Sequence, residues 1–183
     1  MRTILHSDLN NFYASVECLK NPEIRDKPVV VVGSKEDRHG VVLAKNDIAK
    51  ARGVKMGDVY WEAVQKCGPS LVEVQADFSS YLNMSKKVRK IYSDYTDQIE
   101  AYGIDECWLD VTHSKIFGSG EQIADEIRNR VKNELGLTVS VGVSWNKIFA
   151  KLGSDMKKPD AVTVITPENY KEFVWTLPVE DLL

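Results

Sequence analysis

The chain has 183 residues, of which 43% are hydrophobic and 28% charged, and its formal net charge is −3 at pH 7. These values are typical of one globular domain, with or without a small second lobe, and they exclude a wholly basic protein that coats nucleic acid. No stretch approaches the roughly 18 apolar residues of a membrane helix, and no signal peptide begins the chain, so we expect a cytosolic protein without membrane contact. The three cysteines are widely spaced, which disfavours a zinc site.

The first part of the chain alternates β-branched runs with short amphipathic segments. The runs predict strands at 3–8, 29–32, 40–44 and 71–74, because β-branched residues pack well on a pleated surface. Apolar residues at helical spacing predict helices at 10–19, 47–52 and 63–67, which end at Asn-Pro, Gly or Gly-Pro. The charged stretch 34–40 is predicted to be a loop.

The second part of the chain carries the longer helices. We expect helices at 79–97, 121–135 and 146–156, and strands at 99–102, 107–111, 138–144 and 162–165. The helix at 121–135 has an apolar stripe and is followed by Gly136 as its C-cap. The stripe predicted for the helix at 79–97 consists of Leu82, Ser85, Val88, Tyr92 and Tyr95.

The outer elements run strand, helix, strand, strand, helix, strand, which is the order of the split βαβ, ferredoxin-like arrangement. The sequence therefore predicts an α+β fold in which residues 12–77 form a small α/β insertion between the first strand and the first long helix. Residues 177–183 start as an apolar and acidic helix with no helix after it. We expect the chain to be truncated at a domain boundary.

Three carboxylates stand where predicted strands begin or end. Asp8 closes the first strand, and Asp105 and Glu106 lie between two later strands. The first and third strands of a split βαβ unit can be neighbours, which would gather these side chains. Mg²⁺ prefers such oxygen ligands, and two ions can clamp an in-line phosphoryl displacement.

Plainer interpretations of the same residues stay open at this point. Asp8 could cap the helix that follows it, and Asp105 with Glu106 could form a solvated turn. Adjacent residues on a flat strand also face opposite sides, so these two can serve one site only where the backbone twists, as Gly103 would permit.

Three blocks of sequence change the balance between these interpretations. They read DLNNFYASVE from Asp8, IDECWLD from Ile104, and SVGVS from Ser140 followed by NK, FAK and DMKKP. In order and spacing they resemble the conserved blocks of Y-family, translesion-type DNA polymerases, most closely the bacterial polymerase IV type. The resemblance extends from about residue 2 to the last residue. It implies a template-directed enzyme that adds deoxynucleotides to a primer 3′-end by two-metal phosphoryl transfer.

The resemblance also implies a role for each matching residue. Asp105 and Glu106 would be catalytic and, with Asp8 and the Leu9 carbonyl, would bind two Mg²⁺ ions, for which Mn²⁺ could substitute. Tyr13 would be the steric gate that occupies the space of a ribose 2′-hydroxyl. The other residues implied in nucleotide binding are Phe12, Lys50 and Lys158. From the residues alone, Phe12 and Tyr13 could equally be a core stripe, and Lys158 could cap a helix C-terminus.

The domain organisation implied by the resemblance has a palm at residues 1–11 and 78–166, fingers at 12–77 and the start of a thumb at 167–183. The rest of the thumb and the little-finger domain would be absent. Those parts supply most backbone contacts to primer-template DNA in this family, so we expect the fragment to bind DNA poorly and to be poorly active. Any contact with a sliding clamp would lie in the missing C-terminal region.

The sequence departs from the family pattern in the fingers. Many members have Asn-Tyr-Glu-Ala-Arg where this chain has Asn-Asp-Ile-Ala-Lys, so that Asp47 replaces a Tyr and Lys50 an Arg. A planar bidentate donor becomes a point charge, and we expect weaker nucleotide binding, although Lys45 could compensate. Val41 and Leu43, which would roof the nascent base pair, are larger than the Gly and Ala of some relatives, so we expect bulky template lesions to be restricted.

Two other functions are compatible with the same architecture. A nucleotide cyclase can share the palm fold, but it would need a Gly-Gly-acidic-acidic hairpin, which this sequence lacks. A catalytically weak or inactive homologue that acts as a scaffold in DNA repair would be expected to lose its carboxylates, whereas all three are present. The substitutions at Asp47 and Lys50 keep this second alternative open.

Overall fold

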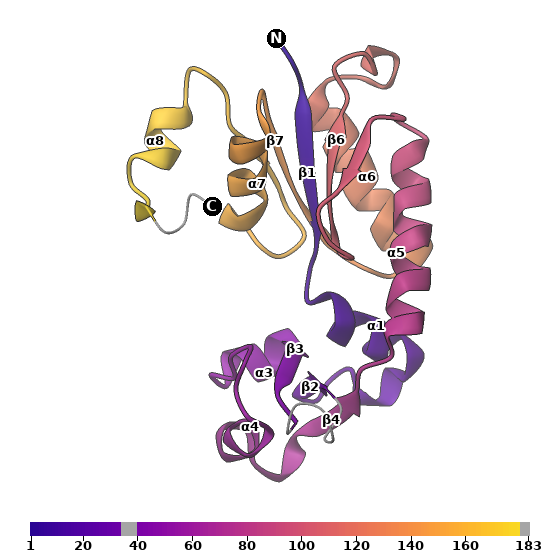
Figure 1. Cartoon of the computed structure of the whole chain (residues 1–183), viewed down its shortest axis with the longest axis vertical. Helices are drawn as coiled ribbons and strands as arrows, with labels where there is room; N and C mark the ends of the chain where they lie inside the picture. The colour runs from indigo at the N-terminus through magenta and orange to yellow at the C-terminus, as the bar shows by residue number, and fades with distance from the viewer. Residues whose placement is uncertain (34–39, 180–183) are drawn as a thin grey trace. The chain divides into compact units, whose positions relative to one another are not determined.

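The computed structural model describes residues 1–33 and 40–179, and its chain forms two compact units. The larger unit consists of Met1–Asn10 and Ser85–Leu183, and the smaller unit of Asn11–Met84 (Figure 1). Most of the loop predicted at 34–40, and the last residues of the helix start predicted at 177–183, lie outside the described residues. The names palm, fingers and thumb remain predictions.

A five-stranded sheet forms the centre of the larger unit. Its strands stand in the order β5 (Ile99–Ala101), β6 (Glu106–Asp110), β1 (Ile4–Leu9), β7 (Val139–Ser144) and β8 (Val162–Val164). β1 is antiparallel to both of its neighbours, and β8 is parallel to β7. With α5 (Phe78–Ser93) and α6 (Gly120–Leu135), the first four strands reproduce the ferredoxin-like order, so the predicted α+β fold is confirmed.

Alternation along the strands separates the two faces of this sheet. Leu5 and Leu109 are fully buried, and the hydroxyl of Ser7 bonds to the Tyr92 hydroxyl of α5 at 2.7 Å, so the odd-numbered positions of β1 face the long helices. The even-numbered positions face α7 (Lys147–Met156), because His6 Nδ1 lies 2.8 Å from Ser154 Oγ. β1 is therefore covered on both faces.

Local signals explain where several helices begin and end. At the start of α6, the Ser119 hydroxyl accepts from the Gln122 amide and the Gln122 side chain accepts from the Ser119 amide, which is a capping box. Gly136 ends this helix in the left-handed conformation, at φ 69°, as predicted. Asn146 caps α7 by accepting from the Phe149 amide at 2.9 Å.

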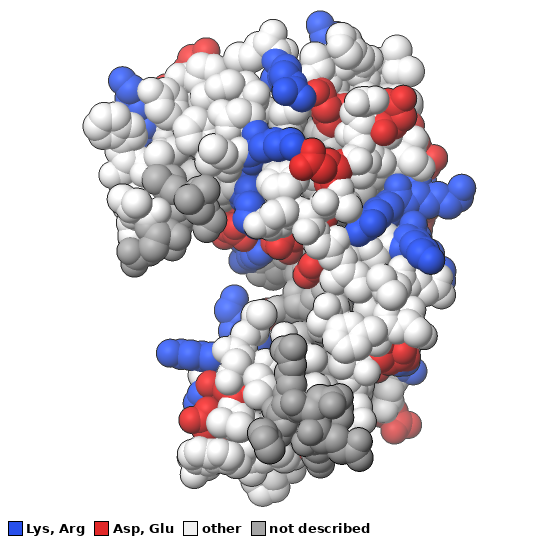
Figure 2. All heavy atoms as spheres, in the orientation of Figure 1, with Lys and Arg blue, Asp and Glu red and all other residues white. Residues whose placement is uncertain are grey.

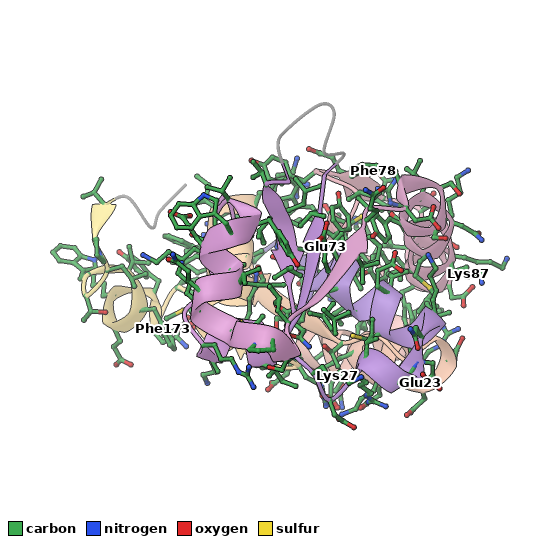
Figure 3. The ribbon with its side chains drawn as sticks, turned by 90° about the horizontal axis from the view of Figure 1, so that it is seen from below. Glu23, Lys27, Glu73, Phe78, Lys87 and Phe173 are labelled. Atoms are coloured by element: carbon green, nitrogen blue, oxygen red, sulfur yellow. The ribbon has the colours of Figure 1, made fainter. Side chains whose placement is uncertain are left out.

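The smaller unit has its own sheet and core. Its strands are ordered β3 (Val42–Lys45), β2 (Val29–Val32), β4 (Val72–Gln75), and its helices are α1 (Phe12–Lys20), α3 (Asp47–Ala51) and α4 (Tyr60–Cys67). Glu73 lies on β4, and Phe78 begins α5 (Figure 3). The core between the sheet and the helices includes Val30, Val32, Val42, Ala49, Val54, Ala63 and Cys67.

Several predicted boundaries were wrong. The helix predicted from residue 79 to 97 ends at Ser93, because the amides of Asp94 and Tyr95 bond only three residues back and the Thr96 hydroxyl donates to the Asp110 carbonyl. α1 starts at Phe12, since Asn11 before it is left-handed, at φ 48°. Leu82 is 52% exposed and does not belong to the buried stripe of α5.

Further corrections concern the smaller unit. The strand predicted at 40–44 begins only at Val42, because Gly40 has a φ of +73° and Val41 makes an isolated bridge with Val59. α4 begins three residues earlier than predicted, where Glu62 accepts from the Val59 amide.

In the part of the chain that the structure describes, four short helices were not predicted. Three are 3₁₀ helices, at Pro22–Ile24, Gly68–Ser70 and Lys115–Phe117. The fourth is α8 (Tyr170–Val174), whose Tyr170 ring packs on Phe149 and Trp145. Among the described residues, no helix has the length and apolar character needed to cross a lipid bilayer.

We predict that Gly142→Ala destabilises the protein by about 3 kcal/mol or more. An added Cβ at this β7 position would lie 1.9 Å from the Ala150 carbonyl oxygen and 2.6 Å from the Ser154 amide nitrogen of α7, so the helix would have to move off the sheet. Urea denaturation should measure the loss. Gly103→Ala is the matched control, because its Cβ would meet only the Asp105 carboxylate at 3.4 Å. Equal stabilities for the two variants would contradict the prediction.

Candidate active site

The predicted carboxylates lie at the adjoining ends of two neighbouring strands. Asp8 of β1 stands directly opposite Glu106, the first residue of β6, so the two share a face of the sheet. Asp105 immediately precedes β6, and its carbonyl accepts from the Leu9 amide at 3.1 Å. The antiparallel register thus brings the three residues together within the larger unit.

A tight reversal before β6 removes the objection that adjacent residues face opposite sides. The amides of Tyr102 and Gly103 both donate to the Glu106 carbonyl, at 3.1 and 3.3 Å. From α5, the Ser85 hydroxyl donates to the Ile104 carbonyl, and Arg89 donates to the Gly103 carbonyl. Because Asp105 belongs to this bend and not to the strand, strand alternation does not govern its side chain.

The electrostatics of the three groups differ. Burial, with the charge of Glu106 adding to it, raises the pKa of Asp8 despite the opposing Lys158 ammonium. Burial and then the charge of Asp8 raise the pKa of Asp105. Contact with His6, and next the Lys151 ammonium, lower the pKa of Glu106 to about 2 although burial opposes them. Ionisation of Asp8 and of Asp105 therefore costs free energy in this site.

Two lysine ammonium groups contact this cluster. Lys158 Nζ donates to Asp8 Oδ2 at 2.6 Å and lies 2.8 Å from Asp155 Oδ1. Lys151 Nζ of α7 donates to Glu106 Oε2 at 2.6 Å. The alternative interpretation of Asp8 as a helix cap is wrong, because Asp8 lies within β1 and the N-cap position of α1 is Asn11.

His6 forms a buried support behind Glu106. The Ser154 hydroxyl donates to the Lys151 carbonyl at 2.7 Å, which leaves its oxygen to accept from His6 Nδ1 at 2.8 Å. The other ring nitrogen, Nε2, lies 3.1 Å from Glu106 Oε2, an ion-pair distance without good hydrogen-bond alignment. His6 is fully buried, so this ring limits where the Glu106 carboxylate can go.

The segment that carries Lys158 is anchored on its far side. Asn10 accepts from the Asp160 amide at 2.9 Å and donates to the Ser140 hydroxyl of β7. The Asp160 carboxylate pairs with Arg128 and Lys132 of α6, at 2.9 and 2.7 Å. These contacts hold the backbone after α7 against both the sheet and α6.

The carboxylate cluster fits a divalent cation in its chemistry but is neutralised by lysines. Within residues 1–33 and 40–179, no three His, Cys, Asp or Glu side chains are arranged as a ready metal centre. Asp8, Asp105 and Glu106 nevertheless offer hard oxygen donors, and burial raises the pKa of the first two. A cation in their midst would relieve that cost.

The other predicted site residues belong to the smaller unit. The Tyr13 ring stacks on Tyr81 at 4.3 Å and meets Phe78 edge-on at 5.8 Å. Phe12 is 3% exposed, so it also belongs to the core of this unit, as the packing alternative expects. Tyr81 in turn donates its hydroxyl to the buried Glu17 at 2.8 Å, which fixes the ring beneath Tyr13.

The basic and roof residues also lie in this unit. Val41 and Leu43 are half-buried and flank the buried Val42, and the register between β2 and β3 is irregular at this point. Lys50 is exposed on α3, and burial together with the nearby Lys50 charge lowers the pKa of Lys45. The carboxylate of Asp47 accepts from Asn11 Nδ2 at 2.9 Å.

Several contacts at the site were not singled out by the sequence pattern. The position of His6 could have been predicted from the sequence, because two-residue alternation puts it on the same strand face as Asp8. The Lys151, Ser154 and Asp155 contacts depend on how α7 packs on the sheet, which a single sequence does not reveal.

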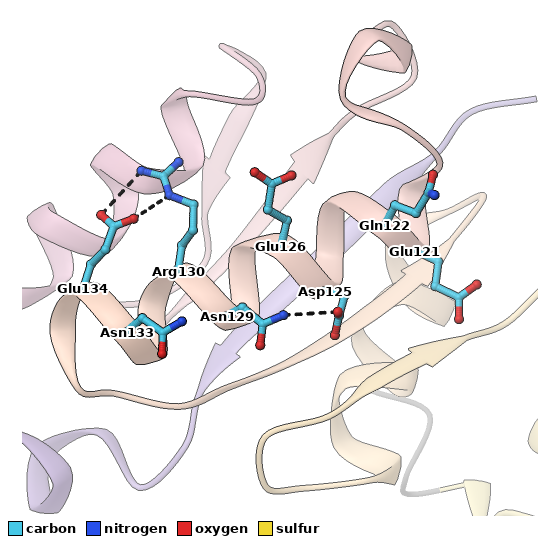
Figure 4. A pocket seen from close by; sticks show the side chains of 8 residues that line it. All are labelled: Glu121, Gln122, Asp125, Glu126, Asn129, Arg130, Asn133 and Glu134. Carbon is cyan, nitrogen blue, oxygen red and sulfur yellow. Dashed lines mark hydrogen bonds and ion pairs between the residues drawn. The ribbon is translucent and has the colours of Figure 1, made fainter.

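Two surface features lie elsewhere. A hollow of about 590 Å³ runs along the exposed side of α6 (Figure 4). None of the predicted site residues lines it; its lining is Glu121, Gln122, Asp125, Glu126, Asn129, Arg130, Asn133 and Glu134. On the face drawn in Figure 2, acidic and basic side chains of the larger unit lie interspersed, in keeping with the small net charge.

Comparison with known proteins identifies similar sequences along the whole chain. A model of the impB/mucB/samB family matches residues 7–155. A DNA polymerase IV of Acetivibrio thermocellus is 66% identical over 183 residues, which are 100% of this chain and 46% of that protein. A DNA polymerase IV of Pseudomonas fluorescens is 44% identical over 99% of this chain and 51% of its own length. The chain thus spans about half the length of these relatives.

Solved structures show the same fold. A Y-family DNA polymerase chimera superposes with a TM-score of 0.91 at 32% identity, over 98% of this chain and 53% of its own. The crystal structure of DinB from Sulfolobus solfataricus gives a TM-score of 0.90 at 32% identity, with the same coverage of both chains.

We predict that Asp105→Asn stabilises the metal-free protein at pH 7 by on the order of 1 kcal/mol. The folded-state pKa of Asp105 is raised, so its ionised form costs stability at neutral pH, and this cost disappears as pH falls below that pKa. The gain should therefore shrink between pH 7 and pH 4. Urea midpoints at both pH values measure it, with Asp97→Asn as the control on an exposed carboxylate. A variant less stable than the wild type at pH 7 would contradict the prediction.

Proposed function

Because the chain belongs to the impB/mucB/samB family of Y-family DNA polymerases, we propose that it is the catalytic part of a translesion-type, template-directed DNA polymerase. It adds deoxynucleotides to a primer 3′-end. The main observation behind the proposal is that Asp8, Asp105 and Glu106 lie together at the adjoining ends of β1 and β6. Carboxylates gathered in this way are what metal-assisted phosphoryl transfer requires.

The proposed cofactor is Mg²⁺, as two ions, with Mn²⁺ as a substitute. Asp8, Asp105 and Glu106, with the Leu9 carbonyl, would hold them. When bound, such ions lower the pKa of the attacking hydroxyl and neutralise charge on the leaving pyrophosphate. The protein's own part is to keep hard oxygen donors in a partly buried place, where the raised pKa of Asp8 and Asp105 supports a need for added positive charge.

Four residues are proposed to bind the nucleotide. Lys158 would hold the triphosphate, and its contact with Asp8 supports a position beside the metal ligands. Tyr13 would exclude the ribose 2′-hydroxyl, with its ring held by Tyr81 and Phe78. Phe12 and Lys50 would complete the site, and Val41 with Leu43 would roof the nascent base pair.

We further propose palm residues 1–11 and 78–166, fingers residues 12–77 and a thumb that begins at 167. The two compact units support the separation of palm from fingers, with the smaller unit at Asn11–Met84. Primer-template DNA and deoxynucleoside triphosphates are the proposed substrates of the whole protein. A sliding-clamp contact and a cytosolic location remain predictions. A scaffold role without catalysis stays the second candidate, because Asp47 and Lys50 alter the family's triphosphate-binding segment.

Cation-dependent nucleotide binding tests the function directly. We expect a deoxynucleoside triphosphate to bind this chain in the presence of Mn²⁺ or Mg²⁺, and Asp105→Asn to weaken that binding by about tenfold or more, since an amide replaces a charged oxygen ligand. Calorimetric titration gives both affinities. The same variant is expected to be more stable than the wild type, so a loss of binding cannot be attributed to unfolding.

Asp97→Asn, which changes a carboxylate outside the site, should bind like the wild type. Binding that is unaffected by Asp105→Asn would refute the assignment of the site. An absence of binding in the wild type and in both variants would favour the scaffold candidate.

Sugar discrimination tests the role of Tyr13. We expect Tyr13→Ala to reduce the preference for dATP over ATP by about tenfold, because removal of the ring opens space for one hydroxyl. Tyr13→Phe keeps the ring and should keep the preference. Competitive binding of the two nucleotides in the presence of Mn²⁺ measures the ratio. An unchanged ratio in Tyr13→Ala would rule out the steric-gate role.

A further inference from the structure

Both lysines at the carboxylate cluster use oxygen lone pairs that a metal ion would need. Lys158 Nζ is 2.6 Å from Asp8 Oδ2, and Lys151 Nζ is 2.6 Å from Glu106 Oε2. The Asp8 and Glu106 side chains are only 11% and 22% exposed, so water screens these ion pairs less than it screens surface pairs. A cation that binds these oxygens must therefore compete with the two ammonium groups.

Each ammonium has a second partner at hand. Lys158 Nζ also lies 2.8 Å from Asp155 Oδ1, on the last turn of α7. Lys151 Nζ lies 5.2 Å from the centre of the exposed Tyr102 ring, within the range of a cation–π contact. Either group can thus leave its site carboxylate without becoming a lone charge.

The backbone that carries Lys158 need not move for this exchange. The Asp160 amide donates to Asn10, and the Asp160 carboxylate pairs with Arg128 and Lys132, which anchors the segment after α7. Asp8 and Asp155 both lie within hydrogen-bonding distance of one Nζ position, so small side-chain rotations suffice to favour one over the other.

We propose that Lys151 and Lys158 are internal counter-cations that occupy the carboxylate cluster of the metal-free protein and are displaced when a divalent ion binds. Asp155 is a positioning residue that accepts the displaced Lys158 ammonium. The inference rests on the proposed function, because it concerns the same site. It adds that metal affinity is reduced by the protein's own lysines and is set in part by Asp155.

Titration with Mn²⁺ alone, followed by the electron paramagnetic resonance signal of the free ion, tests the proposal on this chain. Lys151→Met and Lys158→Met should each bind Mn²⁺ about tenfold more tightly than the wild type, because a competing charge is gone. Lys147→Met is the matched control, since Lys147 stands one helical turn before Lys151 and pairs with Glu100. It should change the affinity far less.

A double-mutant cycle separates Asp155 from a general charge effect. Asp155→Asn should weaken Mn²⁺ binding in the wild type, because Lys158 then stays on Asp8. In the Lys158→Met background the same change should have little effect. An equal weakening in both backgrounds would show that Asp155 acts by its charge alone and would overturn its proposed role.

A measurement on the unaltered protein tests the proposal even if the variants fail to fold. In ¹⁵N-labelled protein, the Nζ signals of Lys151 and Lys158 should shift when Mg²⁺ is added, whereas that of Lys147 should not. Mn²⁺ and nucleotide binding by the wild type, with no gain in either lysine variant and no Nζ shift, would overturn the counter-cation proposal and leave the proposed function intact. No Mn²⁺ binding by any of the proteins would overturn both.

Discussion

The gathering of partly buried carboxylates at the adjoining ends of β1 and β6 is the constraint on which the site in the larger unit is built. The register of β1 and β6 puts Asp8 opposite Glu106, and the bond from the Leu9 amide brings Asp105 beside them. Burial raises the pKa of Asp8 and Asp105; the charge of Glu106 adds to this effect at Asp8, and the charges of Asp8 and Glu106 add to it at Asp105. A protein under selection for stability alone would separate such groups, so their collection marks a site that needs positive charge from elsewhere.

That positive charge comes from one helix and the segment after it. α7 can lie against β7 because Gly142 has no side chain, and a Cβ there would collide with the Ala150 carbonyl. The close approach lets Lys151 reach Glu106 and lets Ser154 hold the His6 ring behind it. Asn10 and Asp160 then fix the turn from which Lys158 reaches Asp8. The small size of Gly142 therefore permits the helix packing that brings Lys151 to Glu106.

Much of the fold follows from local pattern. Apolar and β-branched runs located the strands of both sheets, and the Ser119–Gln122 capping box and Gly136 account for the limits of α6. The meeting of Asp8 with Glu106 followed from strand order once the ferredoxin-like arrangement was recognised. Boundaries governed by tertiary contacts did not follow. α5 stops where Thr96 bonds to β6, and α8 forms where Tyr170 meets Phe149, and neither contact is visible in a window of sequence.

In the predicted fingers, the exchange of residues relative to the family pattern changes the geometry of the basic group and the position of the acid. Asn-Tyr-Glu-Ala-Arg and Asn-Asp-Ile-Ala-Lys each contain one acid and one base, so the exchange relocates the negative charge without altering the sum. Asp47 accepts from Asn11, and the Lys50 charge is close enough to help lower the pKa of Lys45. In the proposed nucleotide site, an incoming triphosphate would therefore meet Lys45, Lys50 and the carboxylate of Asp47. Loss of the planar two-pronged donor of an arginine is one ground on which weaker nucleotide affinity is expected, and the negative charge of Asp47 is the second.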